Sequence, residues 1–343
     1  MSRFLLAPRP AAASGKARPR LGWVLVLLLA GLACQPATVP PPSSGASLHE
    51  RTLTMADGRV RDYLLQFPPG LTPGRPAPLL VVLHGAFSDA REMAGVSGFH
   101  ALADRLGLVV AYPNGLGFLG LFRMWNAGFC CGGPQRDQVD DVHFVLAVIA
   151  DVRARLPVDP GRVYVVGYSN GGMLAHLVAA SHPEKVAALA VVGGTVCAQP
   201  AQAPGAWQPP TPTLAVPVML LHGRDDPRVP YLGGAPPDSG GSYTFCGALY
   251  GAELWAHRNQ AQEPAREEGP VASGVERRVW AAGPPGAPVE LWTLLGWGHA
   301  WPGPPAIPAG PAGPGLAGFN ASQEIWHFCR RFRRDAGATL AGQ

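Results

Sequence analysis

The chain has 343 residues, of which 47% are apolar and 15% charged, and its formal net charge is +4. This length and composition allow a large buried core and fit one large α/β domain better than two. Much of the basic excess lies in the first twenty residues, so no basic face for nucleic acid is expected elsewhere.

The N-terminus has the pattern of an export signal. A basic start leads into an apolar run over residues 21–33, which is short for a membrane span but of the right length for a signal-peptide core. Residues 31–34, Gly-Leu-Ala-Cys, resemble a bacterial lipobox, although such boxes usually carry leucine one position earlier. We expect a signal peptide over residues 1–33 and lipidation of Cys34, with ordinary secretory cleavage after Ala33 as the alternative.

The rest of the chain divides into three predicted parts. A tether rich in proline and serine covers residues 34–47, beginning with the lipidated cysteine. A folded domain is predicted over residues 48–336, and a short tail over residues 337–343. We expect either a lipoprotein anchored in the membrane only through its lipidated cysteine or a secreted, extracellular protein.

Export makes disulfides possible for the five remaining cysteines. Because five is odd, at least one thiol must stay free or pair outside the chain. The neighbours Cys130 and Cys131 could bond to each other, but the commoner outcome is that each pairs elsewhere or stays reduced.

Apolar runs predict a parallel sheet that is covered on both faces. Strands are expected over residues 59–67, 79–83, 108–112, 163–166, 186–192, 216–221 and 289–295, and helices over 92–106, 140–156, 171–182 and 320–332. This alternation predicts a mostly parallel, doubly wound α/β sheet. Two loops rich in proline and glycine, at 195–212 and 301–318, either shape substrate access or are tolerated insertions.

Residues 167–171, Gly-Tyr-Ser-Asn-Gly, lie between a predicted strand and a predicted helix. The two glycines allow a sharp turn at Ser169, because a side chain at either position would clash as the backbone folds back. Such a turn exposes the hydroxyl and aims the first helix amides at an anion that forms beside it. We interpret Ser169 as a nucleophile, and the alternative is an ordinary turn serine.

A nucleophilic serine needs a base within hydrogen-bond reach and an acid that orients the base. On a sheet of this kind the partners follow in the order serine, acid, histidine, each in a loop after a strand. Asp226 follows the strand predicted over 216–221 and is the expected acid, because its spacing from His222-Gly223 and to Val229-Pro230 favours it over Asp225, the reserve. His299 follows the strand predicted over 289–295 and is the expected base.

The segment after the strand over 79–83 is where this arrangement has its second oxyanion donor. We expect the backbone amides of Ala86 and Asn170 to form the oxyanion hole, with Phe87 as a possible substitute for Ala86. His84 is expected to be structural. The pair at 140–141, Asp-Asp, is expected to cap or begin a helix.

Aromatic residues near these loops are the candidates for substrate contact. Trp125, Trp297 and Trp301 could form a wall for a sugar or phenolic ester, together with Phe87, although burial in the core is an equally good reading of a tryptophan. No metal and no organic cofactor is implied, and the oligomeric state is not readable from the sequence.

Seven segments carry a resemblance to a known family. They are residues 83–85 (Leu-His-Gly), 112–115 (Tyr-Pro-Asn-Gly), 125–132 (Trp-Asn-Ala-Gly-Phe-Cys-Cys-Gly), 139–142 (Val-Asp-Asp-Val), 167–173, 222–231 and 298–303 (Gly-His-Ala-Trp-Pro-Gly). Through them the chain resembles the exported esterases grouped as polyhydroxybutyrate depolymerase-like, which are related to the feruloyl and acetyl xylan esterases of carbohydrate esterase family 1.

The resemblance spans about residues 59–303 and implies an α/β-hydrolase catalytic domain. It also implies a serine esterase that acts through an acyl-enzyme, with Ser169 as nucleophile, Asp226 as acid and His299 as base. The partner is then a small or polymeric ester: a hydroxyalkanoate oligomer, a feruloylated sugar or acetylated xylan. The sequence departs from the family by its inserts near 200 and 305, and the lack of a recognisable polymer-binding module argues against action on solid polyester.

Two other functions fit part of the pattern. A serine peptidase of the prolyl-oligopeptidase type shares the G-x-S-x-G-G motif and an acid loop that ends in valine-proline, but no propeller-sized N-terminal domain is present. A non-catalytic exported binding protein could also retain this fold, although all three triad residues are present.

Overall fold

The computed structural model describes residues 47–200, 205–237, 243–303, 316 and 318–335. The predicted signal peptide, the predicted lipidation site at Cys34, the predicted tail and all but the last residue of the predicted tether lie outside these ranges. No helix within the described ranges is long and apolar enough to cross a membrane.

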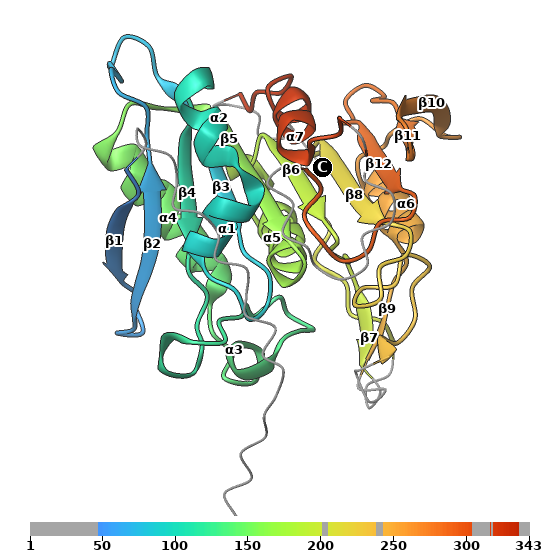
Figure 1. Ribbon diagram of the computed structural model, residues 1–343, viewed down its shortest axis with the longest axis horizontal. Helices are drawn as coiled ribbons and strands as arrows, with labels where there is room; N and C mark the ends of the chain where they lie inside the picture. The colour runs from blue at the N-terminus through green and yellow to red at the C-terminus, as the bar shows by residue number, and fades with distance from the viewer. Residues whose placement is uncertain (1–46, 201–204, 238–242, 304–315, 317, 336–343) are drawn as a thin grey trace, which may run out of the picture. The chain divides into compact units, whose positions relative to one another are not determined.

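A ten-stranded sheet forms the centre of the described chain (Figure 1). From edge to edge its strands are β1 (His49–Thr54), β2 (Val60–Gln66), β4 (Val109–Pro113), β3 (Ala77–Leu83), β5 (Val158–Tyr168), β6 (Ala188–Val192), β8 (Val218–Gly223), β12 (Val289–Leu294), β11 (Val275–Trp280) and β10 (Arg266–Ala272). The strands from β4 to β12 in this order are parallel, and antiparallel strands flank them on both sides. The predicted mostly parallel sheet is therefore confirmed.

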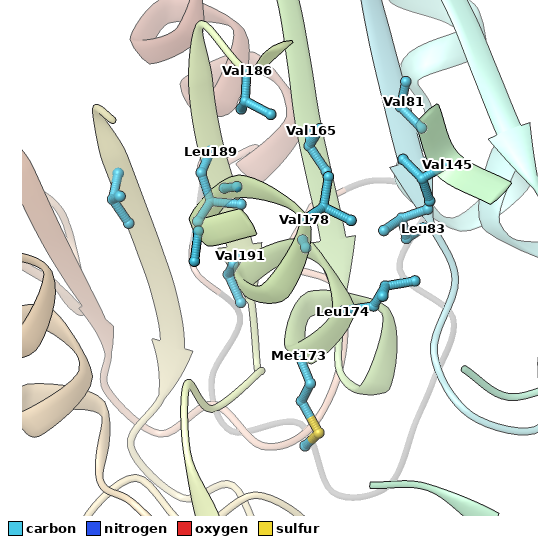
Figure 2. Close-up of a cluster of buried hydrophobic side chains, with 14 of the residues drawn as sticks. Val81, Leu83, Val145, Val165, Met173, Leu174, Val178, Val186, Leu189 and Val191 are labelled. Atoms are coloured by element: carbon cyan, nitrogen blue, oxygen red, sulfur yellow. The ribbon is translucent and has the colours of Figure 1, made fainter. Parts of the chain in front are cut away.

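Helices cover both faces of the sheet, because side chains alternate between the faces along each buried strand. They are α1 (Ala90–Ser97), α2 (Phe99–Leu106), α4 (Asp141–Arg155), α5 (Asn170–Ser181), α6 (Ala248–Arg258) and α7 (Ala321–Cys329), whereas the short α3 (Gly132–Arg136) belongs to the connection between β4 and α4. In β3, Val81 and Leu83 join a core with α4, α5 and α6, whereas Leu80 and Val82 join a second core with α1, α2 and α7. Figure 2 shows part of the first core, including Val145 of α4.

Gly98 divides the single helix that was predicted over residues 92–106. Its φ of 65° is left-handed, so α1 ends there and α2 begins at the next residue. The helix also starts earlier than predicted, because the Asp89 side chain caps α1 by accepting a hydrogen bond from the backbone N–H of Glu92. The prediction of one helix is wrong at this point.

The aspartate pair before the serine caps and begins a helix, as predicted. Asp140 caps α4 and accepts a hydrogen bond of 3.0 Å from the backbone N–H of His143. Asp141 is buried, forms an ion pair of 2.7 Å with Arg61, and accepts a hydrogen bond from the backbone N–H of Asn126. It therefore ties the start of α4 to β2 and to the segment before the two adjacent cysteines.

The loop predicted over residues 195–212 contains a strand, so that prediction is wrong in part. A short β7 (Ala198–Pro200) pairs with β9 (Tyr243–Phe245), and a disulfide between Cys197 and Cys246 joins the same two segments. Most of the second predicted loop, over residues 301–318, lies outside the described ranges.

Cys130 and Cys131 are bonded to each other. The expectation that each pairs elsewhere or stays reduced is therefore wrong. Cys329, the last residue of α7, is a buried free thiol, and it meets the expectation, made from the odd count, that at least one thiol stays unpaired.

Two histidines are buried as neutral imidazoles. The ring of His84 accepts a hydrogen bond from the N–H of Gly115 and donates one to the carbonyl oxygen of Gly85, which agrees with its predicted structural role. The ring of His176 accepts a hydrogen bond of 3.0 Å from the indole of Trp255. Burial lowers the pKa of His84 to about 4 and that of His176 to about 3, from an ordinary value of 6.5.

Acidification is expected to destabilise the fold through these two rings. Between pH 6.5 and about 4 the unfolded chain takes up a proton at each imidazole and the folded chain does not, so the free energy of unfolding falls as the pH falls. Each ring contributes roughly 1.4 kcal/mol per pH unit in this window. Urea unfolding at several pH values measures how steeply the free energy of unfolding changes with pH. This slope should be shallower by about 1.4 kcal/mol per pH unit in a His176→Gln variant. Equal slopes in the two proteins would contradict the assignment.

Candidate active site

Ser169 lies at a sharp turn between β5 and α5, with φ of 53° and ψ of −122°. A Cβ atom at position 167 would clash with the carbonyl oxygen of Gly171, and one at position 171 would clash with the carbonyl oxygen of His84. The prediction that glycines at both positions permit this turn is confirmed. The turn holds a non-glycine residue in the left-handed region, which is typical of a serine presented at the end of a strand.

His299 lies within hydrogen-bond distance of both other predicted triad residues, Ser169 and Asp226. The Nε2 atom of His299 is 2.9 Å from the Oγ atom of Ser169, and its Nδ1 atom is 2.7 Å from the Oδ2 atom of Asp226. The residues follow β5, β8 and β12, which run parallel and therefore end at one edge of the sheet. Because the carboxylate accepts the Nδ1 proton, Nε2 is left to accept the proton of the serine hydroxyl.

Asp226 is held as a carboxylate by several donors. Its Oδ1 atom accepts hydrogen bonds of 2.8 Å from the backbone N–H groups of Arg228 and Val229, and the Nε2 atom of His222 lies 3.4 Å from Oδ2. Burial by itself would raise the pKa of the Asp226 carboxyl, but hydrogen bonds from His222 and His299 outweigh burial and hold the pKa below its ordinary value. A permanent negative charge beside His299 follows.

The reserve acid does not share this environment. Asp225 is exposed, and its backbone N–H donates to the carbonyl oxygen of Trp297. His222, for which the sequence predicts no role of its own, is a second imidazole beside the carboxylate of Asp226. The signal that could have found it is its position at the end of β8, four residues before the acid.

The two predicted oxyanion donors both line the pocket that contains Ser169. Within the described ranges no protein group accepts a hydrogen bond from the backbone N–H of Ala86 or of Asn170, so both are available to a ligand. The predicted substitute is not available, because the N–H of Phe87 donates to the carbonyl oxygen of Arg123 at 2.8 Å. Phe87 is therefore corrected from a reserve donor to a wall of the pocket.

The side chain of Asn170 fixes the start of α5. Its Oδ1 atom accepts a hydrogen bond of 2.7 Å from the backbone N–H of Trp125, and its Nδ2 atom donates to the carbonyl oxygen of the same residue at 3.2 Å. The indole of Trp125 in turn donates to the carbonyl oxygen of His84 at 2.8 Å. These bonds join the serine turn to the loop that carries Ala86.

The three tryptophans do not form the predicted aromatic wall. Trp125 is fully buried, and the indoles of Trp297 and Trp301 donate hydrogen bonds to the carbonyl oxygen of Ala300 and the hydroxyl of Ser322. None of the three lines the pocket beside the serine. That prediction is wrong because the indole N–H groups found partners inside the protein.

The pocket beside Ser169 has a volume of about 530 Å³ and is lined by other side chains. Its apolar walls include Phe87, Tyr168, Met93, Met173, Tyr243, Phe245 and the bonded cysteines at 130 and 131. Arg228 and Glu92 also line it. No group of three or more His, Cys, Asp or Glu side chains that could hold a metal ion occurs within the described ranges.

Tyr168 holds the loop that carries His299, a role that was not predicted from the sequence. Its hydroxyl donates to the carbonyl oxygen of His299 at 2.9 Å, and the two rings stack with centroids 5.3 Å apart. Burial raises the pKa of Tyr168, so the phenol remains protonated and can donate this bond. The signal available in the sequence was its position next to the serine, on the same turn.

We expect Tyr168→Phe to lower kcat on a soluble ester by roughly five- to tenfold, because one net hydrogen bond that positions His299 is lost. The phenyl ring keeps the stacking and the pocket wall, so KM should change little. Steady-state kinetics on p-nitrophenyl butyrate measures both constants. A rise in KM at unchanged kcat would show that the hydroxyl contacts the substrate instead.

Comparisons with known proteins find esterases among the relatives of this chain. The family described as Esterase PHB depolymerase matches residues 61–210. A protein named "Putative esterase NocK", from Nocardia uniformis subsp. tsuyamanensis, is 31% identical over an alignment of 323 residues, and the match covers 83% of this chain and 90% of that protein. Feruloyl esterase B of Piromyces equi is 29% identical over 251 residues, and the match covers 70% of this chain but 42% of that protein.

Among solved structures, the acetyl xylan esterase from Aspergillus awamori is similar over 74% of this chain and 94% of its own, with a TM-score of 0.52 and 16% identity. At that identity the likeness concerns the fold alone. The family match and the full-length similarity to the first relative concern the sequence as well. The chain therefore belongs to the polyhydroxybutyrate depolymerase-type esterases, which are carboxylic ester hydrolases with the α/β-hydrolase fold.

Proposed function

We propose that the chain hydrolyses carboxylic esters through an acyl-enzyme on Ser169, with His299 as base and Asp226 as acid. The observation that carries the proposal is the continuous hydrogen-bonded row from the carboxylate through the imidazole to the serine hydroxyl, at the side of a pocket. Residues 48–336 form the catalytic domain in this proposal.

The reaction begins when Ser169 Oγ attacks the carbonyl carbon of the ester and His299 Nε2 takes the hydroxyl proton. Asp226 fixes the tautomer and stabilises the positive charge that develops on the ring. The backbone N–H groups of Ala86 and Asn170 hold the negative oxygen of the tetrahedral intermediate. His299 then delivers its proton to the leaving alcohol, and a water molecule repeats the cycle on the acyl-enzyme.

Pocket shape and charge favour esters with a compact, largely apolar acyl group. The walls are aromatic and aliphatic, and Arg228 is the cation among the side chains that line the pocket. Hydroxyalkanoyl, feruloyl and acetyl esters all meet this description. The apolar run over residues 21–33 supports export, as a lipoprotein anchored through Cys34 or as a secreted protein.

Labelling with a fluorophosphonate tests the proposal directly, because only an activated serine displaces its fluoride. We expect one adduct per chain, located on Ser169 by mass spectrometry of the peptides. The His299→Asn variant is the matched control, since it keeps the hydroxyl and removes the base, and it should label far more slowly. Failure of the parent protein to label, or an adduct on another serine, would refute the assignment.

A further inference from the structure

Five large apolar side chains form an exposed group. Four of them lie within residues 118–122, and the fifth, Phe87, contacts Phe122. Phe118, Leu119, Leu121 and Phe122 expose between 61% and 83% of their surface, and Phe87 exposes 65%. We call these five residues the apolar rim. Single exposed apolar residues are ordinary on a protein surface, whereas a group of this kind marks a place where another apolar surface binds.

The loop that carries four of these residues keeps its shape without burying them. Backbone hydrogen bonds of 3.1 and 2.8 Å between Leu116 and Met124 close the loop at its base. The guanidinium of Arg123 braces it from inside, by donating to the carbonyl oxygen of Gly120 at 3.0 Å and to the carboxylate of Asp62 at 3.0 Å. Polar contacts therefore fix the loop, and its apolar side chains are left for a ligand.

Backbone strain also accumulates in the rim. Phe87, Leu119 and Phe122 have φ values of 64°, 50° and 53°. Large side chains rarely adopt this left-handed region, and holding them there costs free energy of folding. Three of the five rim residues are thus kept at strained, exposed positions where asparagine or glycine would fit the backbone better.

The rim begins at the active-site pocket. Phe87 lines the pocket together with Ser169, and its ring meets the ring of Phe122 edge to face, with centroids 6.4 Å apart. A flat apolar surface that covers the rim therefore comes to lie at the mouth of the pocket. The occupant that this position fits is one whose own ester groups react at the serine.

We propose that the apolar rim adsorbs the protein onto the surface of a water-insoluble ester, so that ester groups at that surface enter the pocket. This inference rests on the proposed function of the site. Arg123, the cation of the loop that carries four rim residues, is paired with Asp62, so this loop offers no unpaired positive charge of the kind by which proteins select anionic lipid bilayers. The rim gives the catalytic domain a means of adsorption that needs no separate polymer-binding module.

The test separates adsorption from chemistry. The double variant Phe118→Gln with Leu119→Asn removes two exposed apolar side chains, and asparagine suits the left-handed backbone at position 119. Leu106→Gln is the matched control, because Leu106 is 42% exposed on α2 and does not line the active-site pocket. Both changes are also made in a Ser169→Ala background, so that binding to a tributyrin emulsion can be measured without hydrolysis.

We expect the double variant to partition onto the emulsion about tenfold less and to hydrolyse it correspondingly more slowly. Its turnover of soluble p-nitrophenyl acetate and its unfolding temperature should equal those of the parent. The Leu106→Gln control should match the parent in every measurement. Turnover of the soluble ester by the parent tests the proposed function separately, so the two ideas fail in different ways.

Three results would overturn the proposal. Unchanged adsorption in the double variant would show that the rim does not bind the ester surface. An equal loss on soluble and insoluble esters would make the loop part of the pocket. Loss of binding to phosphatidylcholine vesicles, or conversion of a dimer to a monomer in light scattering, without a change in adsorption would assign the rim to a bilayer or to a second copy of the chain.

Discussion

The Ser169→Ala variant is expected to lose about 10⁶-fold in kcat on p-nitrophenyl acetate, because it removes the atom that forms the acyl-enzyme. The oxyanion donors and the pocket remain, so a residual rate of roughly 10³-fold over the uncatalysed reaction is expected. KM should change little, since the hydroxyl contributes to bond formation more than to binding. Burst and steady-state kinetics with highly purified protein measure the loss.

Ser88 provides a matched control for this experiment. It also lines the pocket, but its hydroxyl donates to the carboxylate of Glu92 and has no contact with His299. Ser88→Ala should keep nearly full activity. If Ser169→Ala keeps the parent's turnover while it unfolds at the same temperature, another group is the nucleophile and the proposed mechanism fails.

The buried strands were predictable because each is covered on both faces. In β3 and β4 every residue is buried, so the apolar run in the sequence is continuous. The antiparallel strands β1 and β11, which lie outside the parallel part of the sheet, were missed for the converse reason. Both carry charged side chains that are at least partly exposed, so these short segments show no apolar run to distinguish them from loops.

The order of the triad could be predicted because the fold sets it. Each partner follows a parallel strand, so the serine, the acid and the histidine reach one edge of the sheet whatever the loops between them contain. The choice of Asp226 over Asp225 rested on spacing. The structure gives the physical difference: the Asp226 carboxylate accepts two backbone N–H groups and faces His299, whereas Asp225 is exposed.

The direction of a large side chain could not be predicted in the same way. Nothing in the sequence near Trp125 says that its indole turns inward to the carbonyl oxygen of His84, or that its backbone pairs with Asn170. The same holds for Tyr168, which reaches a carbonyl 131 residues away along the chain. Such contacts depend on how the loops pack after the sheet has formed.

The Asp226→Asn variant is expected to lower kcat by about 10⁴-fold while leaving the fold intact. The asparagine oxygen can still accept hydrogen bonds from the N–H groups of Arg228 and Val229, so the loop should keep its shape. The new amide group, however, donates toward His299 Nδ1 and stabilises the tautomer that carries its proton on Nε2. In that tautomer the ring cannot accept the proton of Ser169.

The Asp225→Asn variant is the matched control for Asp226→Asn. It removes one negative charge from the same loop but leaves the hydrogen bond between Asp226 and His299 in place. Its kcat should stay within about twofold of the parent, as expected for an exposed carboxylate. Kinetics of both variants on one soluble ester, with fluorophosphonate labelling beside them, separates the two aspartates. Loss of activity in Asp225→Asn with activity kept in Asp226→Asn would mean that the loop rearranges before catalysis and that the exposed carboxylate is the acid.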